Sequence, residues 1–445
     1  MTTSRVRTGC VLWVTAAWLA CGDAPPRGDE SLDAGLAPDA IEADTRADAP
    51  DDDATDDAND AGACGPAAVE RAPVDTLPVY EAPQPLLDDV TDADAWWCHA
   101  RPTLLQTMLV YAYGQPLAPT DPVVSVASEH DTLDGAPVRW RQLAVEIGGV
   151  TLHVALWLPA GDGPHPVFVG QNACGNHTVV ADEAMRVTDA FAEPTCPTER
   201  GGRAGRFVVS DVLARGYALA TWHQSDVAAD NVVAAPDSGV YAAGSARLDD
   251  TGVLLAWAWG AAAVVRSLAQ QPEIDRDRVA VFGHSRRGKV ALLTAALEPE
   301  VDLVVSHQSG TLGATLSRSY GGESVLAITS FFAHWLVPGL AEFADRENAL
   351  PFDQHALLAM VAPRPLLVTN GADDDWADPP GALRAVELAD PVWALLGEIG
   401  VVAGPEGLPT LDGRLAWHVR PGGHSIGAED LATFVDFADR HFGAP

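Results

Sequence analysis

The segment that most restricts the fold of this chain runs from Arg278 to Ala296. It reads Arg-Val-Ala-Val-Phe-Gly-His-Ser-Arg-Arg-Gly-Lys, followed by Val-Ala-Leu-Leu-Thr-Ala-Ala. A run of β-forming apolar residues ends at Gly283, and a stretch rich in Ala and Leu, which favour helices, follows within a few residues. A buried strand that passes through a tight turn into a helix is the unit from which parallel sheets are built. The segment therefore predicts an α/β fold.

The chain on both sides of this segment repeats the alternation of strand and helix. The long apolar stretch Val253–Leu268 has helical length, and Ala428–Phe442 places its apolar residues with helical spacing. Short apolar runs between loops predict strands. Alternation on this scale predicts one mostly parallel central sheet covered by helices on both faces, a three-layer sandwich. The predicted strands are 152–158, 166–169, 216–222, 278–282, 303–305, 365–368 and 415–419.

Ser285 is the candidate nucleophile, because it lies in the turn between the predicted strand and the helix. In a nucleophile elbow a sharp turn exposes the Ser Oγ at the edge of the sheet, and the following helix directs N–H groups toward a developing oxyanion. Gly283 leaves room for the turn, and Gly288 lets the helix pack close to the strand. The usual Gly-x-Ser-x-Gly pattern is not met, because Arg287 occupies the second glycine position. The alternative is that Ser285 only caps a buried helix.

Lys289 is the only lysine among the 445 residues, although the chain contains 26 arginines. A composition that uses Arg everywhere else and keeps one Lys here indicates a role for a compact ammonium group. One helical turn after Ser285, this group could reach the hydroxyls of a bound ligand. The alternative is an incidental lysine on the surface.

His424 is the candidate base. In α/β-hydrolases the order along the chain is Ser, acid, His, and His424 follows a strand on the Gly-rich turn Pro-Gly-Gly-His. His418 lies within that strand and is expected to be packed. The loop after 365–368 supplies the acid that the imidazole requires, with Asp374 as first choice and Asp373 as second. The loop after 303–305 offers Gln308 and no carboxylate. A calcium site formed by the aspartates is the alternative.

These motifs together resemble the glucuronoyl esterases, carbohydrate esterase family 15, and especially their bacterial members. Residues 283–289 correspond to the family's Gly-Cys-Ser-Arg-x-Gly-Lys, and residues 308–310 correspond to its Glu-Ser-Gly. Further matching motifs extend the resemblance from about residue 130 to the end of the chain. They lie at 171–177, 321–325, 334–335, 350–355, 362–364 and 376–379.

The resemblance implies the α/β-hydrolase fold. It also implies a serine esterase that cleaves esters of (4-O-methyl-)glucuronic acid in glucuronoxylan and lignin–carbohydrate complexes through an acyl-enzyme. It implies no cofactor and no metal ion, and we expect a monomer. Rival hypotheses are an esterase for another substrate, such as acetylated xylan, and an inactive carbohydrate-binding homologue. The implied roles are nucleophile for Ser285, base for His424, acid for Asp374 or Asp373, oxyanion stabilisation for Arg286, and sugar binding for Lys289, Glu323, Trp335 and Trp376.

The sequence departs from the family pattern at two places. His284 and Ser425 stand where fungal members have a pair of cysteines. Gln308 stands where many members have the catalytic Glu. Some bacterial members carry the acid on the following loop, which agrees with the choice of Asp373 or Asp374.

The N-terminus predicts export. Arg5 and Arg7 precede the apolar run Val11–Ala20, which is too short to span a bilayer, and Cys21 follows it. The ending Leu-Ala-Cys resembles a bacterial lipoprotein signal, so residues 1–21 are predicted to be a signal peptide with Cys21 as the lipidated residue. The alternative is an ordinary cleaved signal peptide, which would leave the protein periplasmic or secreted.

The next segment predicts a disordered tether. Between residues 22 and 63 there are 14 acidic residues, two arginines and no aromatic residue, so this stretch cannot bury enough apolar surface to fold. The tether is predicted to extend to residue 75 and the esterase domain to cover residues 76–445. The net charge of −35 excludes a sequence-independent nucleic-acid binder and disfavours anionic membrane surfaces. A lipid anchor is therefore the only membrane contact that we expect.

Four cysteines remain beyond the N-terminal region, and in an oxidising compartment they can form two disulfides. The local pairing, Cys64 with Cys98 and Cys174 with Cys196, is favoured over the two other pairings. The absence of a Cys-x-x-Cys motif argues against a zinc site.

Overall fold

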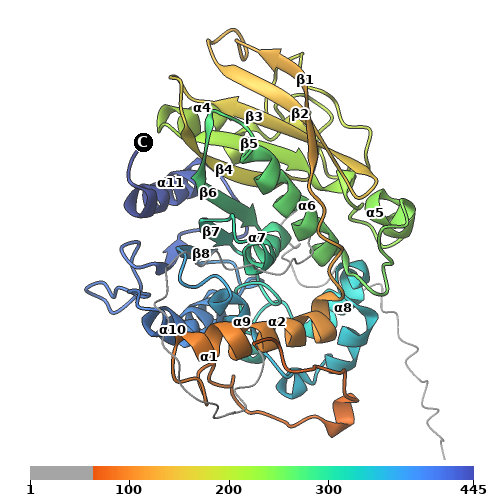
Figure 1. Ribbon diagram of the computed structural model, residues 1–445, viewed down its shortest axis with the longest axis vertical. Coiled ribbons are helices and arrows are strands. Elements are labelled where there is room, and N and C mark those ends of the chain that lie inside the picture. Colours follow the sequence, from red (N-terminus) through yellow and green to blue (C-terminus); the bar gives the residue numbers. More distant parts are fainter. Residues whose placement is uncertain (1–63) are drawn as a thin grey trace, which may run out of the picture.

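The computed structural model describes residues 64–445, which form a nine-stranded sheet between two layers of helices (Figure 1). The strand order is β1-β2-β3-β5-β4-β6-β7-β8-β9. The strands are β1 (Val123–His130), β2 (Arg139–Ile147), β3 (Val150–Leu158), β4 (His165–Asn172), β5 (Ala218–His223), β6 (Ile274–His284), β7 (Leu303–His307), β8 (Leu366–Gly371) and β9 (Leu415–Arg420).

Six strands, from β5 through β4, β6, β7 and β8 to β9, pair in parallel. The first three strands pair antiparallel, and β3 joins them to β5 in antiparallel register. Strands β3 to β9 confirm all seven predicted strands, and the α/β fold with a mostly parallel sheet is confirmed. The hairpin of β1 and β2 extends the sheet beyond the strands that were predicted.

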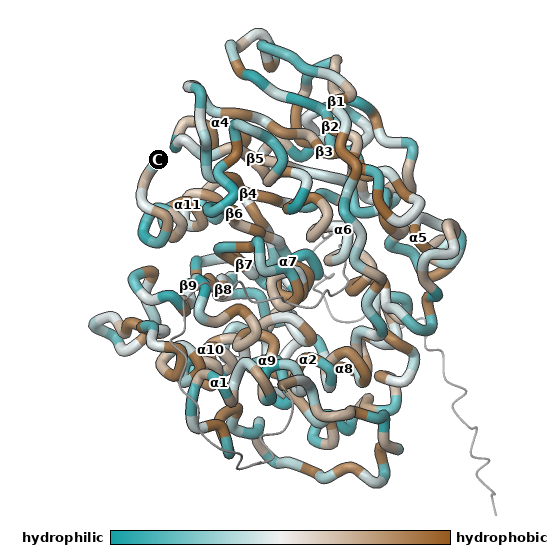
Figure 2. Tube along the Cα trace, viewed as in Figure 1, coloured by the Kyte–Doolittle hydropathy of each residue, from teal (hydrophilic) through white to brown (hydrophobic). Residues whose placement is uncertain are grey.

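The helices cover both faces of the sheet, as predicted. On one face α6 packs against α7 and the central strands, and every residue of α6 except Arg266 is buried. A helix buried on all sides is apolar around its whole circumference, and Figure 2 shows the apolar residues concentrated along the central strands and the adjoining helices. The other face is covered by α3, α4 and α11, with Phe207 and Phe434 packed around Phe282 of β6. The helices are α1 (Ala93–Ala95), α2 (Arg101–Met108), α3 (Ala204–Phe207), α4 (Val209–Ala214), α5 (Gly239–Ala242), α6 (Val253–Leu268), α7 (Arg286–Leu297), α8 (Val325–Phe331), α9 (Gln354–Ala359), α10 (Pro379–Leu395) and α11 (Ala428–Phe442).

Both predicted disulfides are confirmed: Cys64 is bonded to Cys98, and Cys174 to Cys196. The segment after Cys64 lies against the domain, because Val74 is buried and Arg71 donates a 2.6 Å hydrogen bond to the carbonyl of Gly339. The folded chain therefore begins before the predicted boundary at residue 76. The predicted signal peptide, and the tether up to residue 63, lie outside the described residues.

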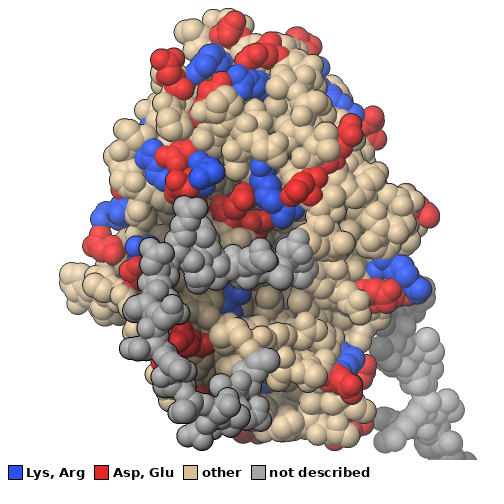
Figure 3. All heavy atoms as spheres, in the orientation of Figure 1, with Lys and Arg blue, Asp and Glu red and all other residues tan. Residues whose placement is uncertain are grey.

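The surface carries charges of both signs. On the face drawn in Figure 3, acidic and basic side chains are intermingled over the end of the molecule that holds β1 to β5. Arg141 of β2 is an example, since it bridges Glu129 and Glu273 at 2.8 and 2.6 Å. Within residues 64–445, no helix combines the length and the apolar character that crossing a bilayer requires.

The carboxyl ends of the parallel strands meet at one edge of the sheet, where ligands bind in open α/β folds. The register places His284 of β6 beside His307 of β7, and His307 beside Thr369 of β8. The loops that leave this edge contain Ser285, Gln308, Asp374 and His424. The sheet thus gathers the predicted site residues from distant parts of the sequence.

Candidate active site

Ser285 occupies a strained turn between β6 and α7. Its backbone has φ 60° and ψ −131°, a conformation that residues other than glycine rarely adopt and that costs free energy unless the surrounding structure holds it. The Ser285 N–H donates to the carbonyl of His307 at 2.8 Å, which fixes the turn to β7. Gly283 is required here, because a Cβ at this position would lie 2.1 Å from the Arg287 carbonyl oxygen. This strand, turn and helix have the geometry of a nucleophile elbow.

His424 and Asp374 are brought together across two loops. The Nδ1 atom of His424 lies 2.6 Å from Oδ2 of Asp374, and both side chains are buried. The second oxygen of Asp374 accepts a 3.2 Å hydrogen bond from the N–H of Ala377. Asp373 is exposed and accepts a hydrogen bond from the Gly422 N–H instead. Of the two aspartates predicted from the sequence, the structure brings Asp374 to the imidazole, while Asp373 braces the turn that carries it.

Gln308 holds the same turn through its side-chain amide. Its Nε2 donates to the carbonyl of Gly423 at 2.9 Å, and its Oε1 accepts from the N–H of Ser425 at 2.9 Å. These two residues flank His424, so the amide fixes the backbone on both sides of the imidazole. Oε1 also accepts a 3.0 Å hydrogen bond from His284 Nε2. A glutamate could not donate to Gly423, which gives a physical reason for an amide at this position.

Two neutral histidines pack beside His424. The ring of His284 lies 4.6 Å from the ring of His424 and 5.1 Å from that of His307. Burial lowers the pKa of His284 well below its ordinary value, and burial lowers the pKa of His307 to about 4. Both rings are therefore uncharged at neutral pH. They support His424 without placing a second positive charge next to it.

Arg286, the first residue of α7, is enclosed by acidic and aromatic side chains. Its Nη1 lies 3.0 Å from Oδ2 of Asp230 and 3.7 Å from Oε1 of Glu193. Its guanidinium carbon lies 4.5 Å from the centroid of the Trp335 ring and 4.8 Å from that of Phe332. Such contacts between a cation and aromatic faces are attractive and fix the position of the guanidinium.

Asp230 joins this arginine to two further side chains. Its Oδ1 accepts hydrogen bonds from His334 Nε2 at 2.6 Å and from the indole N–H of Trp335 at 2.8 Å. Burial opposes ionisation of Asp230, but the hydrogen bond from His334 and the charge of Arg286 outweigh it and lower the pKa. Asp230 therefore remains a buried carboxylate. Asp230 was not predicted from the sequence. Its position in the loop after β5 is the signal that could have identified it.

Glu193 was also not predicted. Burial raises its pKa to about 8, and the charge of Asp230 acts in the same direction while Arg286 opposes it. Glu193 is therefore mostly protonated at neutral pH. It lies three residues before Cys196, whose disulfide to Cys174 fastens this loop to the end of β4.

The predicted sugar-binding residues occupy two different environments. Lys289 Nζ donates to Oε2 of Glu323 at 2.5 Å, and both residues are buried. Trp376 is 43% exposed, and its carbonyl accepts a 2.8 Å hydrogen bond from the Glu323 N–H, so this residue is adjacent to the Lys289–Glu323 pair and open to solvent. Trp335 is only 1% exposed and stacks on Phe332 with 3.9 Å between ring centroids. In this arrangement Trp335 supports Arg286, and Trp376 is the aromatic ring open to a ligand.

Side chains that could hold a metal ion do not gather in the described part of the chain. Within residues 64–445 there is no group of three or more His, Cys, Asp and Glu side chains suited to a metal ion. The chemistry that this site can perform with its own side chains is that of a nucleophile, a base and a cation placed around one edge of the sheet.

The fold and the elbow define the class of α/β-hydrolases. The family model described as "Glucuronyl esterase, fungi" matches residues 203–397. Carbohydrate esterase MZ0003, from an unknown prokaryotic organism, is 33% identical over 394 residues, which are 82% of this chain and 90% of that protein. The chain therefore belongs to carbohydrate esterase family 15, the glucuronoyl esterases, and is a carboxylic ester hydrolase.

Solved structures agree with this assignment. A promiscuous family 15 esterase from a marine bacterial metagenome superimposes with a TM-score of 0.74 at 31% identity, over 83% of this chain and 99% of the other. The glucuronoyl esterase of Solibacter usitatus has the same TM-score at 30% identity, over 83% and 100% of the two chains. The 4-O-methyl-glucuronoyl methylesterase 1 of Wolfiporia cocos is 30% identical over 58% of this chain and 67% of its own length.

Proposed function

We propose that this protein hydrolyses esters of glucuronic acid or 4-O-methyl-glucuronic acid in glucuronoxylan, through an acyl-enzyme formed on Ser285. The observation that carries the proposal is the 2.6 Å contact between His424 and Asp374 at the sheet edge where Ser285 occupies its strained turn. Family membership supplies the class of substrate.

The reaction uses one hydroxyl and one imidazole. The Oγ atom of Ser285 attacks the ester carbonyl carbon while His424 accepts its proton, and Asp374 stabilises the imidazolium that results. The tetrahedral intermediate collapses when the bond to the alcohol oxygen breaks and His424 protonates the departing alcohol. Water, deprotonated by His424, then attacks the acyl-enzyme and releases the free uronic acid and Ser285.

The negative charge of the intermediate is stabilised from α7. We assign this role to Arg286 together with the N–H groups at the start of the helix. Because Asp230, Trp335 and Phe332 hold the guanidinium, it needs little reorganisation when the charge develops. The arrangement favours the transition state over the neutral ester.

We assign the acyl part of the substrate to the side of α7 on which Lys289 and Glu323 lie. Uronate hydroxyls can accept from the ammonium and donate to the carboxylate. The exposed ring of Trp376 offers an apolar face for the C–H surface of the sugar. We further propose that the enzyme acts outside the cytoplasm, held to the cell envelope by a lipid on Cys21.

Comparison of esters tests this function. Methyl glucuronate is expected to be hydrolysed with a higher kcat/KM than methyl galacturonate or acetylated xylan, and Ser285→Ala is expected to abolish turnover of all three. Faster release of acetate would contradict the proposed substrate. Unchanged hydrolysis by Ser285→Ala would contradict the mechanism, and binding of the sugar without turnover by the native chain would indicate an inactive homologue.

A further inference from the structure

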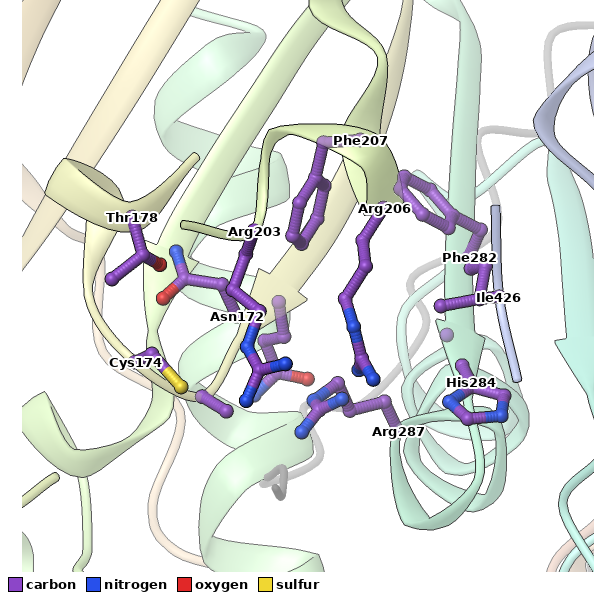
Figure 4. Close-up of a pocket in the computed structure, with 13 residues that line it drawn as sticks. Asn172, Cys174, Thr178, Arg203, Arg206, Phe207, Phe282, His284, Arg287 and Ile426 are labelled. Carbon is purple, nitrogen blue, oxygen red and sulfur yellow. The ribbon is translucent and has the colours of Figure 1, made fainter. Parts of the chain in front are cut away.

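Three arginine side chains converge on a pocket beside the turn that carries Ser285. Arg203 immediately precedes α3, Arg206 is the third residue of α3, and Arg287 is the second residue of α7. Figure 4 shows their guanidinium groups directed toward the same space, next to His284 and Ile426. None of these arginines takes part in the catalytic and sugar-binding groups proposed above.

This pocket lies on the opposite side of α7 from Lys289 and its partner Glu323. Positions 287 and 289 are separated by about 200° around an α-helix, so their side chains leave in nearly opposite directions. Lys289 reaches Glu323 and comes within 6.0 Å of the Trp335 ring centroid. Arg287 instead meets the side chains of α3 and the end of β4. The arginine pocket and the Lys289–Glu323 pair thus lie on opposite sides of the helix that follows Ser285.

The arginine pocket is on the side of His424. His284 lines it, and the ring of His284 packs 4.6 Å from that of His424. Ile426, two residues after His424, lines it as well. The imidazolium must protonate the departing alcohol, so in a bound ester the alcohol lies on this side and the acyl group on the other. The pocket therefore adjoins the alcohol part of the ester.

The arginines give the lining of the pocket its positive charge. Arg287 is only 6% exposed, and burial, followed by the charge of Arg287, lowers the pKa of Arg206 to about 9. At this pKa the Arg206 guanidinium is still charged at neutral pH. His284 donates through Nε2 to Gln308, and its buried Nδ1 has no hydrogen-bond partner within residues 64–445.

We propose that this pocket is a subsite for a carboxylate carried by the alcohol part of the ester. Guanidinium groups match carboxylates in shape as well as charge and bind them with two parallel hydrogen bonds. The substrates favoured by this enzyme would then be uronate esters whose alcohol is itself an acid. The inference rests on the proposed esterase function, and it specifies the leaving group that the enzyme prefers.

Three glucuronate esters that differ in one group test the subsite. Their alcohols are benzyl alcohol, 4-(hydroxymethyl)benzoate and 4-(hydroxymethyl)benzamide, which present a hydrogen, a carboxylate and a neutral amide at the same position. The native chain is expected to hydrolyse the carboxylate ester with a kcat/KM about tenfold higher than the amide ester, as charge-assisted hydrogen bonds predict. Equal values for the three esters would overturn the proposal.

Variants separate a binding role from a structural one. Arg206→Gln and Arg203→Gln remove the charge and keep a hydrogen-bond donor on a shorter side chain, and each is expected to remove most of the preference for the carboxylate ester while hydrolysis of the benzyl and amide esters continues. Arg247→Gln removes a charge that is 79% exposed and is the matched control, expected to retain the preference.

The outcomes are distinct from failure of the esterase function itself. A loss of rate that is equal for all three esters in Arg206→Gln and Arg203→Gln would show that the arginines only maintain the structure, and it would overturn the subsite. If the native chain hydrolysed none of the three esters, the proposed esterase function would fail instead. Preference for the carboxylate ester that survives both substitutions would also contradict the assignment.

Discussion

At the scale of single residues, Asp373 and Asp374 are adjacent and yet face different partners. Asp374→Asn is expected to lower kcat by a factor on the order of 10³ to 10⁴, because an amide neither fixes the tautomer nor stabilises the imidazolium of His424. Hydrolysis of methyl glucuronate measures the effect. Asp373→Asn is the matched control and is expected to change kcat far less, and equal losses in the two variants would contradict the assignment of the acid.

Gln308 gives a second test at this scale. Gln308→Glu removes the donor to the Gly423 carbonyl and places a carboxylate oxygen against it. We expect a loss of about 1–3 kcal/mol in the free energy of unfolding, as for other buried groups left without a partner, together with a lower kcat. Thermal unfolding and steady-state rates measure both quantities. A variant as stable and active as the native chain would show that the amide does not hold the His424 turn.

Glu193 makes stability depend on pH. Its pKa in the folded chain, about 8, is above its ordinary value of 4.5, so between these values the folded state retains a proton that the unfolded chain has lost. The free energy of unfolding therefore falls as the pH rises through this window. Glu193→Gln stays neutral, and its Tm is expected to fall less between about pH 5 and pH 8. The same pH dependence in both proteins would contradict the assignment of the raised pKa to Glu193.

The nucleophile, the base and the acid were predictable because each lies in a short sequence motif. The turn around Ser285, the Gly-rich turn before His424 and the aspartates after a strand are each readable from a few neighbouring residues. Asp230 and Glu193 were missed because their importance comes from packing against Arg286, which lies far away in the sequence. The burial of Trp335 was also missed for this reason, since only the packed structure reveals that Phe332 covers its ring.

At the scale of elements, buried strands and helices and the amphipathic helix α11 were predictable, whereas the exposed edge strand β1 and the proline-containing helix α10 were not. The central strands and α6 consist almost entirely of apolar residues, so their composition identifies them. β1 lies at the edge of the sheet and is largely exposed, which removes the apolar signal. The helix α10 contains Pro391, a residue that normally argues against a helix.

The disulfide between Cys174 and Cys196 gives a prediction for a loop. Replacing both cysteines with Ser releases a loop of 22 residues and is expected to cost about 3 kcal/mol of stability through the entropy of the unfolded chain. We also expect kcat to fall, because the disulfide holds the loop in which Glu193 contacts Arg286. Tm and kcat of the double variant measure the two effects.

The second disulfide supplies the control. Replacing Cys64 and Cys98 with Ser also lowers stability, but this bond lies in the N-terminal segment, so kcat at a temperature where the protein remains folded is expected to persist. A similar loss of kcat in both double variants would contradict a specific role for the loop 174–196.

At the scale of the whole molecule, the sheet and its two helical layers form a platform, and every proposed catalytic group leaves from one edge of it. The fold class was predictable because alternation of strands and helices is a property of the entire chain. The start of the folded part was misplaced, since the packing of residues 64–75 depends on a disulfide and on distant partners such as Gly339.

The predicted anchor is also a property of the whole molecule. Cys21→Ser is expected to prevent lipidation, so the protein would move from the membrane fraction to the soluble extract when it is produced in a bacterium with a lipoprotein pathway. Incorporation of labelled palmitate into the native chain, and not into the variant, measures this directly. A native chain that is soluble and unlabelled would indicate an ordinary cleaved signal peptide.

The burial of the single lysine has a practical consequence. Reagents that acylate primary amines find no other lysine in this chain, and the ammonium of Lys289 is shielded by its pair with Glu323. Apart from the chain terminus, labelling by an activated ester would therefore require the pair to separate. The rate of such labelling would therefore measure how often the Lys289–Glu323 pair separates. A tightly bound uronic acid is expected to slow the labelling.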